Sequence, residues 1–476
     1  MDEAVQVSGR AAGRTQSRSR AGALRSPAMR AALIVAACLG LGAVSLANLP
    51  AVLSFDPWAW MAFGREIAHG TLDTVGTSSW KPLTAVLVIP FTALGAQGAQ
   101  LLWVLFIRAV AFATLALAGR LAWRLAGPGA AVVAVVALAL AVGGIRYAGP
   151  GTSEWLACGL VLLAAERAEA GSHRAALIAG CGSALLRPEG WLVLGIYGLW
   201  LWLRDPRMRV WVAAGAVVVL AGWFIGDWVG SGNPFTGASD ADIGAGTVGF
   251  SGTLTQCLGM LPPFGGVLAI VGLVLAARER NRFILLLAGA VAIWFVVVVV
   301  SAADGFPGGS RFAFPSAGLE AVIAGWAAVR LVALAGERRR PLAWAALGVV
   351  ALATAIPHAQ SVWHERHNVL VLSLDSRELT TALDRAGGAR GTERCGAVRD
   401  NGNESEIAFR LRRPESLFNK RERLPALLVL RVDRRHGTPY QQLRLVGVPY
   451  RLRLLGRADM WRVWAAAAVG GAAGCA

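Results

Sequence analysis

The segment NLPAVLSFDPWAWMAFGREIAHG, residues 48–70, joins a long apolar run to a charged side chain almost without a break. The run from about 31 to 53 is long enough to cross a bilayer by itself, and Asp56 follows it three residues later. An ionisable side chain at a membrane boundary is costly to keep out of water, so it indicates either a function or a partner. The rest of the chain must show which of the two applies to Asp56.

The composition predicts a membrane protein. Of the 476 residues, 55% are hydrophobic and 16% are charged, whereas soluble domains carry about 25% charged residues. The net charge of +17 comes from arginines in the tail, residues 1–29, and in the short gaps between apolar runs. Cytoplasmic loops have this pattern, so nucleic acid is not an expected partner. The tail itself is expected to be disordered and cytoplasmic, and the first apolar run, too long for a signal peptide, is expected to remain as an anchor.

Apolar runs of membrane-spanning character recur eleven times between residues 30 and 357. A further run, 82–94, is short and contains two prolines. If 82–94 does not cross, every arginine-rich gap falls on the cytoplasmic side with the N-terminus, as the positive-inside rule requires. We therefore expect 82–94 to be an interfacial or re-entrant helix inside an outer loop, 54–98. The predicted spans are roughly 31–53, 99–120, 129–146, 152–168, 174–187, 190–203, 209–226, 257–277, 283–300, 312–334 and 341–357.

Residues 358–476 have a mixed pattern that predicts a small extracytoplasmic α/β domain. The segment 368–387 is interpreted as a strand followed by an amphipathic helix, and 424–433 and 440–456 as strands. Outside the cell a disulfide between Cys395 and Cys475 is possible.

Two carboxylates on the predicted outer face, Asp56 and Glu154, lie beside Trp58 and Trp155. Partial desolvation raises the pKa of a carboxylate, which suits it to accept a proton. Simpler roles remain open, because Asp56 could be a solvated loop residue or a cap and Glu154 could be the N-cap of its helix.

Three cations on the same face, Lys81, Arg187 and Arg311, could hold a phosphate where water is scarce. Alternatively, Arg187 could bind carbonyls freed by Pro188, and Arg311 could be an ordinary loop charge. The cysteines and histidines have no metal-ligand spacing. No metal or other cofactor is indicated, although a divalent metal remains possible.

Six short motifs occur in an order that resembles the GT-C superfamily of polytopic glycosyltransferases, particularly the branch with protein O-mannosyltransferases and lipid A aminoarabinose transferases. The resemblance covers roughly residues 30–335. One departure is Pro57, which replaces the second acid of the usual Asp-Glu pair and leaves a metal-binding role of that motif in doubt. The motifs are FDPWAWMAFGREIAHGTLDTVGTSSWKPL (55–83), FIRAVAFATLALAGRLAWRLAGPGAAVVA (106–134), RYAGPGTSEWL (146–156), LLRPEGW (185–191), GSGNPFTG (230–237) and GGSRFAFPSAGL (308–319).

This resemblance implies an all-α polytopic core, 30–357, of about eleven transmembrane helices in the plasma membrane. It implies an inverting glycosyltransferase that takes a sugar from a polyprenyl-phosphate donor and gives it to an envelope glycan, lipid or protein outside. Asp56 would be the base and Glu154 would orient it or the acceptor; Lys81, Arg311 and then Arg187 would bind the lipid phosphate. The alternatives are a lipid or polysaccharide flippase or exporter, and a non-catalytic GT-C-like protein that binds glycans.

Overall fold

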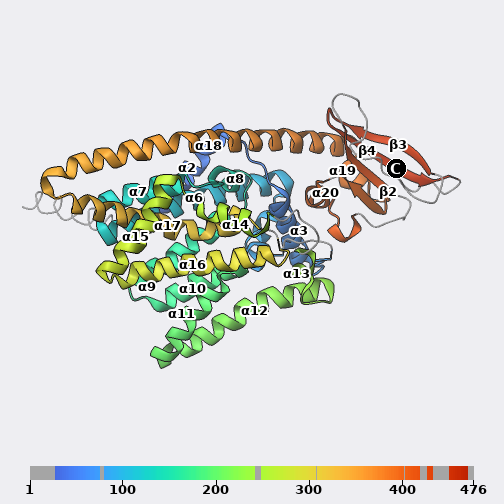
Figure 1. The fold of residues 1–476 in the computed structure, drawn as a ribbon. Helices are drawn as coiled ribbons and strands as arrows, with labels where there is room; N and C mark the ends of the chain where they lie inside the picture. Colours follow the sequence, from blue (N-terminus) through green and yellow to red (C-terminus); the bar gives the residue numbers. More distant parts are fainter. Residues whose placement is uncertain are drawn as a thin grey trace, which may run out of the picture.

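The computed structural model describes residues 27–75, 80–241, 248–306, 308–400, 402–418, 426–432 and 450–469. The tail predicted to be disordered lies almost entirely outside these ranges. The described chain forms a helical core and a small four-stranded sheet near the C-terminus, connected by one long helix (Figure 1).

Each apolar run predicted to span the membrane contains a helix, although not every run is helical along its whole length. Within the described residues, six helices are long and apolar enough to cross a bilayer, and a seventh span results if α14 (Gly249–Leu258) and α15 (Pro263–Glu279) are counted as one broken span with an 87° bend. The chain is thus a multi-pass membrane protein. The helices that correspond to the eleven predicted runs are, in chain order, α2 (Pro27–Asn48), α6 (Gly95–Ala126), α7 (Pro128–Ala139), α9 (Glu154–Glu169), α10 (His173–Ala184), α11 (Trp191–Arg204), α12 (Arg209–Ser231), α15 (Pro263–Glu279), α16 (Arg282–Ala303), α17 (Ser310–Leu334) and α18 (Arg340–Arg385).

The predicted count of eleven spans is not confirmed. At a rise of about 1.5 Å per residue, the 12 residues of α7 or α10 reach only about 18 Å, whereas the hydrocarbon layer is about 30 Å thick. Apolar composition identified these helices correctly, but it does not reveal where a helix ends inside the core.

α17 is the central helix of the core and packs against α6, α7, α9, α15 and α16. Two glycines permit this close packing. A Cβ on Gly325 would lie 2.3 Å from the carbonyl oxygen of Ala130 on α7, and one on Gly318 would lie 2.6 Å from Leu162 of α9. Small residues let helix backbones approach in a membrane. The outer end of α17, which carries Arg311, is therefore held firmly against its neighbours.

The described residues of the segment 54–98, which the sequence predicts to be an outer loop, contain three short helices, α3 (Phe55–His69), α4 (Pro82–Leu87) and α5 (Ile89–Thr92). Neither α4 nor α5 is long enough to cross a bilayer, in agreement with the prediction that 82–94 does not span it. α3 packs on both of them, and a Cβ on Gly64 would lie 2.6 Å from Val88. This packing fixes α3, and Asp56 at its start, above the core.

α18 runs for 46 residues along the core and into the C-terminal domain (Figure 1). The strand predicted at the start of 368–387 is wrong, because these residues continue the helix. A short apolar run cannot distinguish a strand from a helix face, and Val369, Ser373 and Ser376 are buried at helical spacing. The predicted domain boundary at 357/358 consequently falls inside α18, at Pro357.

The sheet contains β1 (Ala397–Asp400), β2 (Ala426–Arg431), β3 (Tyr450–Arg457) and β4 (Trp461–Ala468), in the order β1-β2-β4-β3. Only the β1–β2 pair among them is parallel. The strands predicted within 424–433 and 440–456 are confirmed by β2 and β3, although residues 433–449 lie outside the described chain. The end of α18 and α20 (Glu404–Leu411) pack on the sheet and complete the domain core.

Cys395 forms a disulfide, and Cys38, Cys158, Cys181 and Cys257 are free thiols. The partner expected from the sequence, Cys475, lies outside the described residues.

The C-terminal domain docks on the outer loop through α20 and α3. The Arg65 guanidinium donates to the carbonyl oxygens of Phe409, at 2.9 Å, and Arg413, at 3.2 Å. These carbonyls lie at the C-terminal end of α20, where a cation is favoured by the helix dipole. Trp58 packs against Phe409 with 5.5 Å between ring centroids, and Arg410 lies 5.0 Å above the Trp58 ring.

The predicted topology can be tested by cysteine labelling with an impermeant reagent. We expect labelling from outside at His69→Cys, in the outer loop, and at Arg453→Cys, in the C-terminal domain. Glu337→Cys, between α17 and α18, should be labelled only after permeabilisation. All three side chains are exposed, and the wild-type chain with its four buried thiols gives the background. Labelling of Glu337→Cys in intact cells would contradict the topology.

Candidate functional site

The structure brings together all five side chains that the sequence singled out. They come from five separate segments, and each lies at the start of a helix or turn, so the N-terminal ends of these elements meet at one point. Asp56 is the second residue of α3, Lys81 precedes α4, Glu154 begins α9, Arg187 precedes the turn η1 (Pro188–Gly190), and Arg311 is the second residue of α17.

Arg311 connects the two carboxylates. Its Nε donates to Glu154 Oε1 at 2.6 Å, and its Nη2 pairs with Asp56 Oδ2. Its side chain keeps 35% of its surface exposed, whereas that of Asp56 keeps 14%. Arg311 is therefore a central cation that can still be reached from outside the site, and not an ordinary loop charge.

Glu154 is fully buried and binds two guanidinium groups, those of Arg311 and Arg187. The alternative that Glu154 is the N-cap of its helix is wrong, because Ser153 occupies that position. Arg187 also lies 3.8 Å from Glu189 Oε1 and 5.1 Å above the Phe312 ring. Arg187 is thus paired with carboxylates and supported by an aromatic face, which stabilises a cation away from water.

Lys81 lies 3.7 Å from Asp56 Oδ2, with its ammonium 4.8 Å above the Trp60 ring, and only 8% of it is exposed. Burial, together with the nearby Arg187 and Arg311, lowers the pKa of Lys81 to about 7, although Asp56 and Glu154 act in the opposite direction. The charge of Lys81 is thus sensitive to pH near neutrality and to any additional anion in the site.

Three cations face two carboxylates among these five side chains. Two buried atoms of the cluster, Arg187 Nε and Glu154 Oε2, have no hydrogen-bond partner within the part of the chain that the structure describes. A site with three clustered cations, little water and a spare guanidinium donor is suited to an anion such as a phosphate. The partly exposed carboxylate of Asp56 beside it could accept a proton.

Several supporting residues were not predicted. Tyr147 Oη lies 3.2 Å from Ser310 Oγ, next to Arg311, and its ring packs on Phe314 at 5.1 Å. Glu365, on α18, accepts hydrogen bonds from the backbone N–H groups of Gly143, at 2.9 Å, and Arg146, at 3.1 Å. It thereby holds the start of α8 (Gly144–Ala148), which carries Tyr147. Tyr147 could have been noticed in the sequence, because it follows Arg146 in the RYAGPGTSEWL motif. No sequence pattern pointed to Glu365.

Arg108, which lies inside an apolar run, is structural. It donates to the carbonyl oxygens of Leu49, Pro50 and Gly149 at 2.6, 3.0 and 3.1 Å and so connects the outer end of α2 to the segment before Glu154. Within the described ranges, no group of three or more His, Cys, Asp or Glu side chains is arranged to hold a metal ion.

No protein-family model and no curated protein sequence matches the chain. Among solved structures it is similar to ArnT from Cupriavidus metallidurans bound to undecaprenyl phosphate, with a TM-score of 0.56 and 16% identity over 95% of this chain and 100% of that one. The chain shares the fold of ArnT. The apo state of that protein gives a TM-score of 0.54 and 17% identity over 92% of this chain and 98% of its own.

This similarity confirms at the level of the fold the GT-C resemblance that the six motifs indicated. The oligosaccharyltransferase of Archaeoglobus fulgidus in complex with Zn and sulfate aligns with 80% of this chain and 61% of its own length, at 15% identity and a TM-score of 0.45. That likeness is too remote to support a further conclusion.

Proposed function

We propose that the protein transfers a sugar from a polyprenyl-phosphate donor to an acceptor on the extracytoplasmic side of the membrane, with inversion at the anomeric carbon. The observation that carries this proposal is the convergence of Lys81, Arg187 and Arg311 on Asp56 and Glu154 at the outer end of the helical core. An ArnT-like fold, in a relative whose structure contains undecaprenyl phosphate, supports it.

The donor phosphate would bind among the three cations. Arg311 offers two donors in a planar fork, which matches phosphate oxygens, and Lys81 adds a point charge. Because both groups now pair with Asp56, a phosphate would draw them partly away from that carboxylate. Asp56 would then become more basic at the stage when the donor is in place.

The reaction would then proceed by direct displacement. The acceptor hydroxyl oxygen attacks the anomeric carbon and forms the new glycosidic bond, while its proton passes to Asp56. The bond between the anomeric carbon and the phosphate oxygen breaks, and the lipid phosphate leaves with the electron pair. Lys81, Arg187 and Arg311 stabilise the charge that develops on this oxygen. Glu154, bound to two arginines, keeps the cations in position.

A transfer assay with the purified protein in nanodiscs tests the proposal. The protein is mixed with a panel of polyprenyl-phosphate sugars and with cell-envelope glycans, lipids and proteins as acceptors. We expect one donor to release polyprenyl phosphate together with a glycosylated acceptor. Movement of the lipid between leaflets without any transferred sugar would instead support the flippase alternative. Glycan binding without either activity would support a non-catalytic role.

The pKa of Lys81 predicts how the affinity for undecaprenyl phosphate depends on pH. A bound phosphate stabilises the ammonium and raises its pKa, so the affinity is highest below pH 7, where Lys81 is already charged. Above pH 7 the free protein must first take up a proton, and the affinity should fall by up to about tenfold per pH unit. The ligand is largely dianionic in this range, since the second phosphate pKa is about 6. Lys81→Arg should show a flat profile between pH 7 and 9; an equally steep profile in that variant would contradict the assignment.

A further inference from the structure

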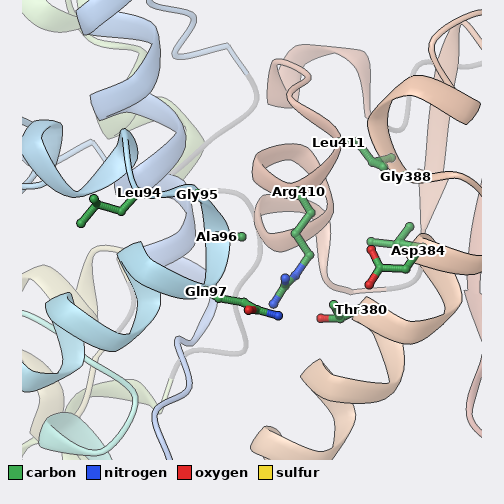
Figure 2. A pocket seen from close by; sticks show the side chains of 10 residues that line it. Leu94, Gly95, Ala96, Gln97, Thr380, Asp384, Gly388, Arg410 and Leu411 are labelled. Atoms are coloured by element: carbon green, nitrogen blue, oxygen red, sulfur yellow. The ribbon is translucent and has the colours of Figure 1, made fainter.

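A cavity of about 320 Å³ lies where the C-terminal domain meets the outer start of α6 (Figure 2). One wall is the segment Leu94–Gln97, and the other is formed by the end of α18, the start of α19 (Gly388–Gly391) and α20. The position of Leu94–Gln97 at the outer end of a spanning helix puts the cavity at the membrane surface. Its volume is at the lower end of the range for small-molecule sites. The residues of the second wall are Thr380, Leu383, Asp384, Gly388, Arg410 and Leu411.

The polar groups of the cavity combine hydrogen-bond donors and acceptors. Figure 2 shows the Arg410 guanidinium extending toward the side-chain amide of Gln97 and the hydroxyl of Thr380, with the Asp384 carboxylate nearby on α18. The amide and the hydroxyl can each donate and accept, Asp384 accepts and Arg410 donates. A ligand with many hydroxyl groups, each of which donates and accepts, fits such a lining.

The charges of the cavity disfavour an ion. Arg410 is already paired, because its Nη2 lies 2.8 Å from Glu406 Oε1. Asp384 would repel a phosphate, and one carboxylate beside a guanidinium is a poor cation site. A neutral ligand avoids both problems.

The cavity is also connected to the proposed catalytic centre. Arg410, which lines it, lies 5.0 Å above the ring of Trp58, and Trp58 is two residues after Asp56 on α3. Trp58 is almost fully buried, so it transmits contact from the C-terminal domain directly to the first turn of α3. A ligand that contacts Arg410 in the cavity is therefore linked, through the Trp58 ring, to the first turn of α3, which carries Asp56.

We propose that this cavity binds a neutral, hydroxyl-rich sugar unit of the acceptor. The identification as acceptor rests on the proposed function, but the binding of a sugar does not. The C-terminal domain would thus supply an acceptor subsite at the membrane surface, formed jointly with the first residues of α6.

Saturation-transfer NMR on the full-length protein in nanodiscs tests the binding without any reaction. The probes are neutral mono- and disaccharides, each of glucose, mannose, galactose or N-acetylglucosamine, and inorganic phosphate is added separately as a competitor of the bound sugar. We expect at least one sugar to bind, and Asp384→Ala and Gln97→Ala each to weaken it fivefold or more. Both side chains are exposed, so these variants should fold. Asp459→Ala, an exposed aspartate of the same domain that does not line the cavity, is the matched control and should bind like the wild type.

Three results would overturn the proposal: no sugar binds, inorganic phosphate displaces the bound sugar, or sugar binding is unchanged in both cavity variants. Sugar binding that depends on Asp384 in a protein without transferase activity would keep the subsite and refute only the proposed reaction. Where transfer is measured, Asp384→Ala should raise the KM for the acceptor fivefold or more and leave the KM for the lipid donor unchanged.

Discussion

Asp56→Asn should lower the rate of sugar transfer by about 10²-fold or more, the usual contribution of a general base. The substitution keeps the shape of the side chain and an oxygen that can accept from Arg311, but it removes the negative charge and the ability to take a proton. The measurement is kcat with saturating donor and acceptor. The amount of protein in the membrane should be unchanged, since the position is at the start of α3 and the replacement is isosteric.

The lipid phosphate provides a second readout for the same variant. Asp56 competes with a bound phosphate for Lys81 and Arg311, so undecaprenyl phosphate should bind Asp56→Asn at least as tightly as the wild type. A matched control is Asp73→Asn, on the same outer loop, whose Oδ1 accepts from the backbone N–H of Val75. That variant should stay within a few-fold of wild-type activity. A fully active Asp56→Asn enzyme would refute the role of Asp56 and leave Glu154 as the remaining carboxylate.

Much of the candidate site could be predicted because its charges are exceptional in their surroundings. Lys81, Arg187 and Arg311 are cations on the predicted outer face, where the positive-inside rule does not account for them. Asp56 and Glu154 are acids next to tryptophans at the ends of apolar runs. Topology placed all of them on one side of the membrane, and the fold then brought them together because each begins a helix or turn at that side.

Other features could not be predicted because they depend on contacts between distant segments. Glu365 holds the start of α8 from more than 200 residues away, and no local pattern distinguishes it from an ordinary helix-surface residue. The cavity likewise forms only when α20 docks on α3 and its wall faces Leu94–Gln97. The strand assigned to the start of 368–387 failed for a related reason. Its apolar residues fit either structure, and the decision came from packing of the helix against the C-terminal domain.

The number of spans shows a different limit. Hydropathy located the helices but could not give their lengths, since α7 ends at Ala139 and the chain then turns through Gly143 at a φ of 86° into α8. The predicted span 129–146 treated this whole segment as one helix. A helix can end inside the core where neighbouring helices or side chains provide hydrogen-bond partners for its terminal N–H and C=O groups. Amino-acid composition does not show where such partners are available.

Arg311→Ala should weaken the binding of undecaprenyl phosphate and lower kcat/KM for the lipid donor. A hydrogen bond to a charged group contributes about 1.5–3 kcal/mol, which corresponds to about 10- to 150-fold. Lys81 and Arg187 remain in the variant, so binding should be weakened but not abolished. Glu154 keeps its pairing with Arg187, and the buried carboxylate is therefore not left alone. The protein should fold, and the loss can be assigned to the ligand.

Arg311→Lys separates the fork of the guanidinium from its charge. It should recover only part of the affinity, because a compact ammonium lacks the rigid planar fork with which the guanidinium matches phosphate oxygens and now spans Asp56 and Glu154. Arg146→Ala is the control, since Arg146 is an exposed cation near the site whose backbone N–H, which the substitution keeps, donates to Glu365. The Asp56 and Arg311 variants should affect different steps. Asp56→Asn should reduce kcat and leave lipid binding intact, whereas Arg311→Ala should weaken lipid binding. If Arg311→Ala binds undecaprenyl phosphate as the wild type does, the phosphate assignment fails even though the fold is that of ArnT.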